Sequence, residues 1–229
     1  MAKQQLTLDN LLPAPEKARL GILEMIKTGQ IPSGQRIDQR AISRHLELTT
    51  APIREALSSL ETDGFLQRIP GVGIFCKAYT VDEVEEIIEI RDVLEGLAAR
   101  RAAERISNSQ KEQLLKMAEN LSSEGIFETD KDFLEAHIAF HSFIAEISQS
   151  DRLIQMLKCN HIIQQVLWNI SANIWPVAPH DHTEIAQAIC SGDPQKAEQT
   201  IRNHIAPTFK DRIKQLKLEY GRKPIVAQN

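Results

Sequence analysis

The long helical periodicity of residues 80–218 constrains the fold of this 229-residue chain more than any other feature. Apolar residues recur there at the three- and four-residue spacing of one helix face, without strand-like alternation. Glycine, proline and small polar residues interrupt the period often enough to separate six or seven helices. Because such helices bury their apolar faces against one another, an all-α antiparallel bundle is expected. The interruptions lie at residues 107–108, 122–125, 149–151, 176–179 and 192–194. Thr80 and Glu83 have the spacing of a capping box at the start of this region.

The first 78 residues show a different pattern, in which short helical segments are separated by turns. Residues 15–28 have helical spacing, and Asp38 is placed to cap a second, short helix. A third helix is expected after the break at residues 48–49. Residues 65–78 alternate around a glycine-rich turn, which predicts a β-hairpin. Three helices followed by a hairpin have the form of a winged helix-turn-helix, so the chain is expected to be mostly α with a small β-hairpin wing.

Composition excludes several classes of protein. Hydrophobic residues make up 42% of the chain and charged residues 25%, as in ordinary globular domains. No apolar run approaches the ~18 residues of a membrane helix, and no signal segment opens the chain, so we expect a cytoplasmic protein without a membrane partner. The three cysteines are odd in number and far apart, which disfavours a disulfide framework or a four-cysteine zinc site.

The start of the third helix carries the small and polar side chains that entry into a DNA groove requires. Thr49, Thr50 and Ala51 open this helix. Arg54 follows one turn later, where it can reach a guanine edge or a phosphate. These four residues are the candidates for base and backbone contacts in double-stranded DNA.

Further contacts are expected from the second helix and the hairpin. Arg40 and Arg44 are one turn apart and offer phosphate contacts. Gly71 lies at the tip of the hairpin, where it would allow a close approach to the DNA backbone or the minor groove. The alternative is that the three helices only pack together beneath a surface hairpin.

Four stretches of residues 29–75 are specific enough to indicate a family. They read GQIPSG at residues 29–34, TTAPIREAL at 49–57, LETDGF at 60–65 and PGVG at 70–73. This part of the chain resembles the DNA-binding domain of the GntR superfamily. The resemblance implies that Arg40, the residues opening the third helix and Arg54 contact the operator. Thr50 departs from the family, which usually has an arginine there that reads a guanine, so the departure affects operator sequence and affinity.

Residues 80–215 resemble the FCD effector domain of the FadR-type subfamily of GntR regulators. The motif RDVLE at residues 91–95 and the paired alanines that follow carry the first part of this resemblance. The segment from His182 to His204 carries the second. We therefore expect a DNA-binding domain over residues 10–78 and an all-helical effector-binding and dimerisation domain over residues 79–220.

Charge agrees with this division, although the signal is small. Residues 1–78 hold 10 basic and 8 acidic side chains, whereas the remainder of the chain holds 17 and 23. Only the first domain has a balance that suits phosphate.

The histidines of the second domain are candidate metal ligands. His137 and His141 are one helical turn apart, so their imidazoles share one face, an arrangement that suits a transition-metal ion. His182 and His204 would join them from later helices. The resemblance implies a divalent metal held by an aspartate and three histidines. His141, His182 and His204 match the three histidines, and His137 stands where the aspartate is expected.

Replacing the aspartate by an imidazole changes which metal the site prefers. Four neutral imidazoles favour zinc, nickel or copper over manganese, which prefers oxygen ligands, and zinc is the first expectation with nickel as a possibility. Alternatively, His137 faces away and three histidines hold the ion. His161 either lines the same pocket or has a packing role.

Two roles are possible for Arg91 on the sequence alone. It can pair with Glu95, one turn further along the same helix. The resemblance implies instead that this arginine faces the cavity and meets an anionic effector, because a guanidinium binds carboxylates well.

The resulting function is a ligand-responsive DNA-binding transcriptional regulator, expected to be a homodimer on a pseudo-palindromic operator, with a small carboxylate effector at the metal site. One alternative is a DNA-binding regulator whose helical domain only dimerises. Another is a histidine–metal hydrolase, but metalloproteases place a general-base glutamate directly after the first histidine, and Ile138 stands there. We therefore expect the protein not to be an enzyme.

Overall fold

In a computed structural model, the described residues are 12–123, 127, 129–170 and 182–225, without the side chains of 168–170 and 206–208. The chain divides into two compact units. The first runs to Tyr79 and includes Ile225, and the second runs from Thr80 to Pro224. Ile225 joins the first unit through its amide, which donates a hydrogen bond to the Tyr79 carbonyl at 2.8 Å. The break expected at residues 176–179 lies outside the described residues.

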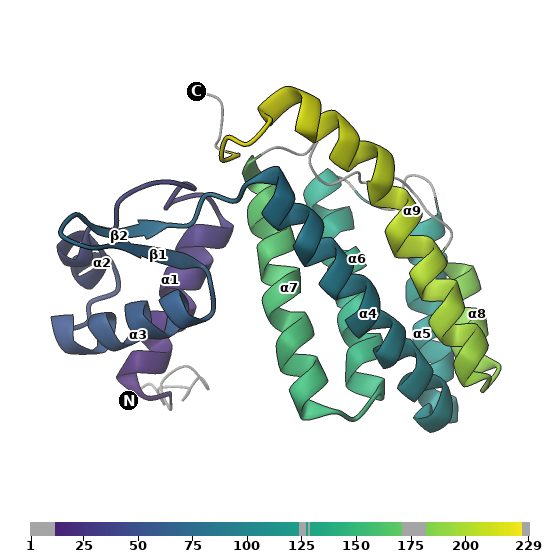
Figure 1. The fold of residues 1–229 in the computed structure, drawn as a ribbon. Coiled ribbons are helices and arrows are strands. Elements are labelled where there is room, and N and C mark those ends of the chain that lie inside the picture. Colours follow the sequence, from purple (N-terminus) through teal and green to yellow (C-terminus); the bar gives the residue numbers. More distant parts are fainter. Residues whose placement is uncertain (1–11, 124–126, 128, 171–181, 226–229) are drawn as a thin grey trace, which may run out of the picture. The chain divides into compact units, whose positions relative to one another are not determined.

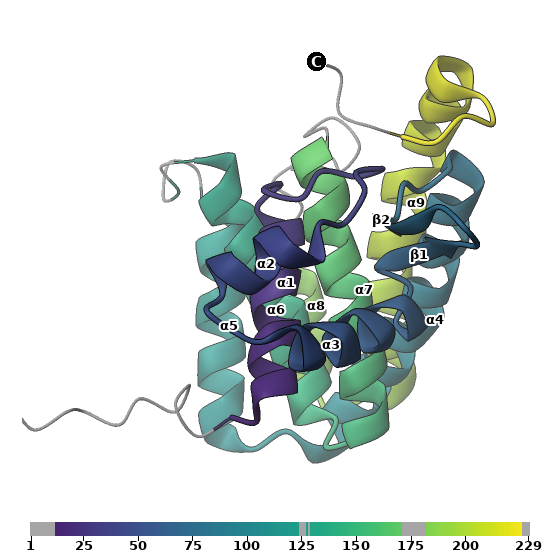
Figure 2. The ribbon, with the colours of Figure 1, turned by 90° about the vertical axis from the view of Figure 1, so that its left-hand side faces the viewer.

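The first unit consists of three helices and a two-stranded antiparallel hairpin (Figures 1 and 2). Leu66 lies opposite Cys76, and Ile69 lies opposite Gly73, at the two ends of the hairpin. This architecture confirms the prediction of a mostly α chain with a winged helix-turn-helix. The elements are α1 (Ala14–Lys27), α2 (Gln39–His45), α3 (Thr50–Thr62), β1 (Leu66–Ile69) and β2 (Gly73–Cys76).

Local side-chain bonds explain where two of the helices begin. The Asp38 carboxylate accepts hydrogen bonds from the amides of Arg40 at 2.9 Å and Ala41 at 3.0 Å, so α2 starts directly after it. Thr80 and Glu83 form the predicted capping box at the start of the second unit. Both signals act within one helical turn, which is why the sequence reveals them.

The core of the first unit brings α1 and α3 together. Ile22 of α1 and Ile53 and Leu57 of α3 are fully buried. Gly21 has a special place in this packing, because a Cβ atom there would lie 2.7 Å from the nearest methyl carbon of Leu46, just after α2. The absence of a side chain therefore lets Leu46 pack directly on α1.

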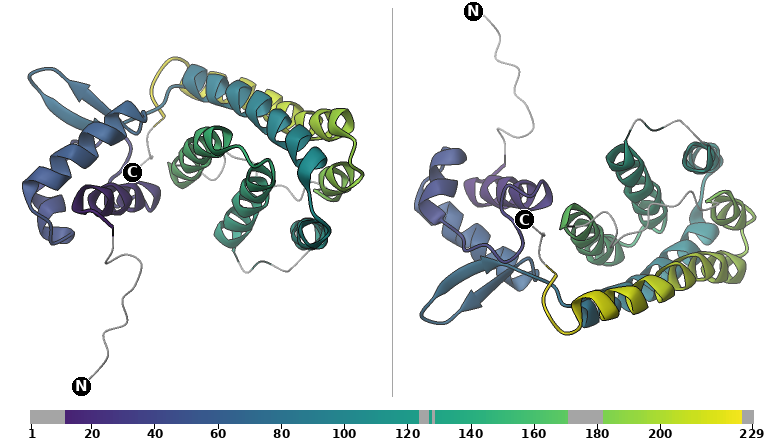
Figure 3. Two further views of the ribbon diagram at one scale, coloured as in Figure 1. Left: turned by 90° about the horizontal axis from the view of Figure 1, so that it is seen from below. Right: turned by 90° about the horizontal axis from the view of Figure 1, so that it is seen from above.

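The second unit is built from helices alone in the described residues (Figure 1). Seen end on, the helices stand around a common core (Figure 3). This confirms the prediction of an all-α C-terminal domain. The helices are α4 (Val81–Arg105), α5 (Asn108–Ser122), α6 (Asp130–Ile147), α7 (Asp151–Ile170), α8 (Thr183–Cys190) and α9 (Pro194–Tyr220).

The two longest helices, α4 and α9, run side by side in opposite directions (Figures 1 and 3). Ala98, Ala99 and Ala102 of α4 are almost fully buried. A Cβ atom at Gly96 would lie 2.9 Å from Cδ of Arg202. Small residues on α4 therefore allow the close approach of α9, which carries His204.

Among the described residues, no helix combines the length and the apolar character that crossing a membrane would require.

We expect Gly21→Val to loosen the first unit. The added methyl groups would displace Leu46 from α1 and destabilise the unit by about 1–3 kcal/mol. Hydrogen–deuterium exchange of the α1 and α2 amides measures this, because it reports the two units separately. Leu20→Val, at an exposed neighbouring position, is the control and should leave protection unchanged. Unchanged protection in Gly21→Val would show that the contact is unimportant.

Candidate DNA-binding surface and metal centre

The outward face of α3 carries the side chains that the sequence singled out. Thr49, Thr50, Ala51 and Arg54 are all exposed. Thr49 is the N-cap residue, but its side chain makes no capping hydrogen bond, so its hydroxyl is available to another partner. The inward face of the same helix is formed by the buried residues Pro52, Ile53, Ala56, Leu57 and Leu60. Helical period thus separates an apolar packing face from a polar outer face.

A hollow on this side of the unit gathers several of these residues. It is lined by Arg36, Asp38, Arg40, Thr50 and Arg54, where the starts of α2 and α3 meet. In Figure 2 both helices lie toward the viewer. The structure therefore brings Arg40, Thr50 and Arg54 together, and three guanidinium groups surround one concave surface.

Arg44 and Gly71 are exposed but do not line this hollow. Gly71 has φ +72° at the turn of the hairpin, a conformation that favours glycine.

Sequence analysis missed Arg36, which lies between α1 and α2. Its backbone forms a β-bridge with Phe75 of the hairpin. A Cβ atom at Gly73 would lie 2.8 Å from Nε of Arg36, so glycine makes room for the guanidinium beside the wing. Arg36 belongs to no helical period, and only the folded hairpin places it next to Arg40 and Arg54.

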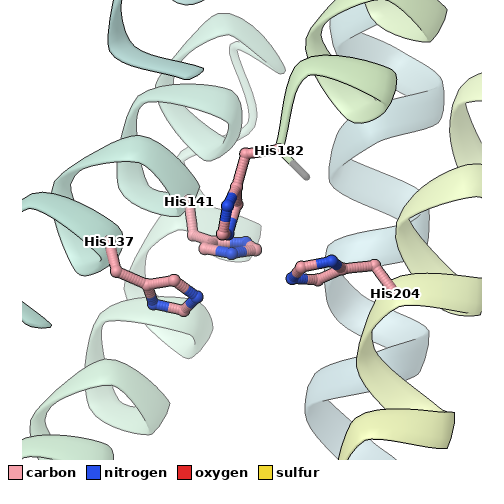
Figure 4. Close-up of side chains that lie close together, drawn as sticks. All are labelled: His137, His141, His182 and His204. Carbon is pink, nitrogen blue, oxygen red and sulfur yellow. The ribbon is translucent and has the colours of Figure 1, made fainter. Parts of the chain in front are cut away.

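The four histidines of the second unit form one cluster (Figure 4). Each of His137, His141, His182 and His204 offers one ring nitrogen, and these four atoms all lie within 4.8 Å of one another. The ring centroid of His137 lies 4.6 Å from that of His141 and 5.0 Å from that of His182. In this structure His137 therefore faces the other three histidines.

Three separate elements supply these imidazoles. His137 and His141 lie on α6, which starts at a capping box formed by Thr129 and Asp132. His182 is the residue directly before α8. His204 lies on α9. The cluster thus joins residues that are up to 67 positions apart in the sequence.

The chemistry of the cluster fits a metal ion. Nε2 of His141 is buried and has no hydrogen-bond partner among the described residues. A buried ring nitrogen without a partner is unfavourable, so a group from outside the protein is expected to satisfy this atom. Burial also holds the pKa of His137 well below its ordinary value, so the imidazole is neutral and can donate a lone pair.

Glu95 of α4 orients one of these ligands. One carboxylate oxygen is hydrogen-bonded to Nδ1 of His141, and the other accepts a hydrogen bond from Nε of Arg91. A bond at Nδ1 selects the tautomer whose Nε2 is free to point into the cluster. The Arg91–Glu95 pair was one of the two roles that the sequence predicted for Arg91. The contact with His141 was missed because 46 residues separate the partners.

The charges around the cluster nearly cancel. Burial alone would raise the pKa of Glu95, but Arg91 and His141 hold this pKa well below its ordinary value, so the carboxylate is ionised. Burial lowers the pKa of His141 despite the neighbouring carboxylate. Arg91 and Glu95 then balance each other, and the imidazoles of His137 and His141 are neutral, so a divalent cation would add positive charge that nothing in this group cancels.

His161 lies behind this arrangement on α7. Its Nδ1 shares a hydrogen bond with the Ser142 hydroxyl at 3.0 Å, and its Nε2 lies 3.6 Å from the nearer Glu95 oxygen. His161 therefore adjoins Glu95 and is not one of the four clustered histidines.

Comparison with known proteins places the two units in known families. Residues 86–207 match the FCD domain, and residues 16–76 match the bacterial regulatory proteins of the gntR family. The chain is 25% identical over 208 residues to the HTH-type transcriptional regulator LutR of Bacillus subtilis (strain 168), covering 79% of this chain and 93% of that protein. It shares the fold of E. coli McbR/YncC, with a TM-score of 0.68 and 17% identity, over 92% of this chain and 100% of that one.

The two matched domains together span the exposed face of α3 and the histidine cluster. The proteins of this family are transcriptional regulators. This confirms the prediction that the protein is not an enzyme and excludes the hydrolase hypothesis. The chain belongs to the GntR family of bacterial regulatory proteins, carries an FCD domain, and is a DNA-binding transcriptional regulator.

Proposed function

We propose that this regulator is a homodimer whose FCD domain binds a divalent metal, zinc or nickel, through His137, His141, His182 and His204, and responds to a small organic carboxylate. One observation carries the proposal, namely four imidazole nitrogens within 4.8 Å of one another. Of the histidines that supply them, His141 has a buried Nε2 without a hydrogen-bond partner in the described part of the chain.

The ligand set supports zinc or nickel over manganese. Zinc is commonly held by four nitrogen or sulfur atoms, and imidazole also suits nickel. His137 replaces the aspartate that related domains use, so no carboxylate oxygen is among the four ligands. When bound, the metal supplies a concentrated positive charge at the centre of the helical unit.

That charge, together with Arg91, favours an anionic effector. Arg91 is buried, and it lies close to the cluster because its Nε is bonded to the Glu95 carboxylate that also contacts His141. A small carboxylate would meet the metal and the guanidinium together. The effector can change DNA affinity only if it binds the DNA-competent and incompetent states with different affinities.

DNA contacts are assigned to the first unit. The start of α3 would enter the major groove. There it would contact base edges through Thr49, Thr50, Ala51 and Arg54. The basic residues around this helix and the wing would contact the DNA backbone. Such contacts position the protein on DNA without reading its sequence. These residues are Arg36, Arg40, Arg44 and Gly71. In a dimer, two copies of α3 would read the half-sites of a pseudo-palindromic operator.

The second candidate is a regulator whose helical domain only dimerises. It leaves the buried Nε2 of His141 without a partner among the residues that the structure describes, so we favour the metal-binding regulator.

Removing Arg54 and removing Arg36 should affect DNA binding differently. Arg54→Ala should weaken binding to an operator selected from random oligonucleotides by about 1–3 kcal/mol and relax the preference for one base pair. Arg36→Ala should weaken binding to all sequences alike and reduce the slope of log affinity against log salt by about one. Fluorescence anisotropy at several salt concentrations measures both. Lys214→Ala removes a charge from the second unit and is the control. A change of base preference in Arg36→Ala, with an unchanged salt slope, would contradict its role.

The four histidines should hold one metal ion per chain. After reconstitution with zinc or nickel and removal of free metal, elemental analysis should find one equivalent in the wild type. His141→Ala and His182→Ala should lose it, because each removes a ligand. If all four histidines bind the ion, His137→Ala should also lower the metal content; if three suffice, it should keep one equivalent. His45→Ala, in the first unit, should keep the metal. Full metal content in both His141→Ala and His182→Ala would exclude this site.

A carboxylate effector should stabilise only the metal-loaded protein. In a thermal-shift screen of small organic acids, a true effector at about 100 times its dissociation constant should add about 2.7 kcal/mol of stability. Arg91→Lys should reduce this shift, since an ammonium cannot reproduce the two-pronged guanidinium contact. The uncharged amide of the same acid is the control. An equal shift after metal removal would show that the acid binds elsewhere.

A further inference from the structure

One face of α4 is apolar and exposed, although the rest of this helix is packed into the bundle. Ile90 is 51% exposed, Val93 54% and Leu97 38%. Their spacing of three and four residues places them in one stripe along the helix. In Figures 1 and 3, α4 and α9 lie at the outside of the helical unit. Exposed apolar stripes of this kind mark interaction surfaces.

The two ends of this stripe carry opposite charges. Glu86 precedes Ile90 by one turn and is exposed. Arg100 follows Leu97 by one turn and is also exposed, although its Nη1 lies 3.5 Å from the Glu198 carboxylate. Val93 is halfway between Glu86 and Arg100 in the sequence. The stripe therefore has an acidic end, an apolar middle and a basic end.

This order makes the stripe complementary to itself. If a second identical helix is laid across it in the opposite direction, about an axis at Val93, each acidic end meets a basic end and the apolar residues meet in the middle. A two-fold interface requires this property, since the same surface appears on both partners. A surface adapted to a different protein has no need of charges placed symmetrically about one residue.

We propose that the α4 stripe, formed by Glu86, Ile90, Val93, Leu97 and Arg100, is the face on which a second copy of this chain docks, α4 against α4 and antiparallel. Ile90 then lies against the partner's Leu97, and Glu86 pairs with the partner's Arg100. The inference rests on the homodimer of the proposed function and assigns its surface. Spacing of three and four residues is the pattern by which two helices interlock their side chains.

The distance between Glu86 and Arg100 along α4 makes these two charges a test of the proposed surface. Glu86 and Arg100 are 14 residues apart on one helix, a separation of about 21 Å at the rise of an α-helix. They cannot form an ion pair within one chain. Any energetic coupling between the two positions must therefore pass between two chains.

The first experiment places a charge at the centre of the stripe. Val93→Asp should raise the dimer dissociation constant, measured by analytical ultracentrifugation of the full metal-loaded chain, on the order of 100-fold, because two unpaired carboxylates would meet in an apolar contact. Leu218→Asp, at a position 89% exposed on α9, is the control and should leave the constant unchanged. Circular dichroism and metal content verify that each variant is folded. An unchanged constant in Val93→Asp overturns the proposal.

The second experiment exchanges the charges, and it also decides the matter if Val93→Asp fails to fold. Each variant is made with Glu198→Gln, which removes the carboxylate beside Arg100 within the chain. Glu86→Arg alone and Arg100→Glu alone should each weaken the dimer roughly 10-fold through like-charge contacts. The double variant should return to within about threefold of its parent, because the exchanged charges meet across the two-fold axis. If the double variant is as weak as both single changes combined, the antiparallel arrangement is wrong.

The outcomes separate this surface from the proposed function. A wild-type chain that stays monomeric at all concentrations overturns both the homodimer and the stripe. A dimer that resists Val93→Asp and shows no charge rescue overturns the stripe and leaves the homodimer standing.

Discussion

The buried contact between Glu95 and His141 is the interaction on which the second unit depends. It joins α4 to α6, and by occupying Nδ1 of His141 it leaves Nε2 for the cluster. Arg91 balances the charge of the same carboxylate. A buried ionised carboxylate is tolerated only when partners of this kind compensate for its lost hydration. A neighbouring side of α4 is held close to α9, the helix that carries His204, at Gly96.

This arrangement gives α4 two different faces. The inner face carries Arg91 and Glu95 beside the histidines, and the outer face carries the apolar stripe centred on Val93. In the proposed regulator, the effector and the second copy therefore act on opposite sides of one helix. A rigid helix transmits a small displacement along its length, so binding at the inner face can alter the geometry of the dimer.

The structural predictions that followed from spacing alone concern residues close together in the sequence. The Asp38 cap, the Thr80–Glu83 capping box and the Arg91–Glu95 pair each involve residues no more than four positions apart. Their geometry follows from the helix itself, whatever the rest of the fold does. Arg36 and the bond between Glu95 and His141 were missed for the opposite reason, since their partners come from elements brought together only by folding.

The sequence by itself determined the order of the helices, the winged helix-turn-helix and the pairing of His137 with His141 on one helical face. These features depend on period, capping and turn residues, all of which are local. Only the tertiary structure decided that His182 and His204 meet that pair, that His137 faces inward and that Glu95 stands behind His141. Such contacts depend on how closely helices approach one another, and that distance is set by small residues and packing across the whole unit, which periodicity does not encode.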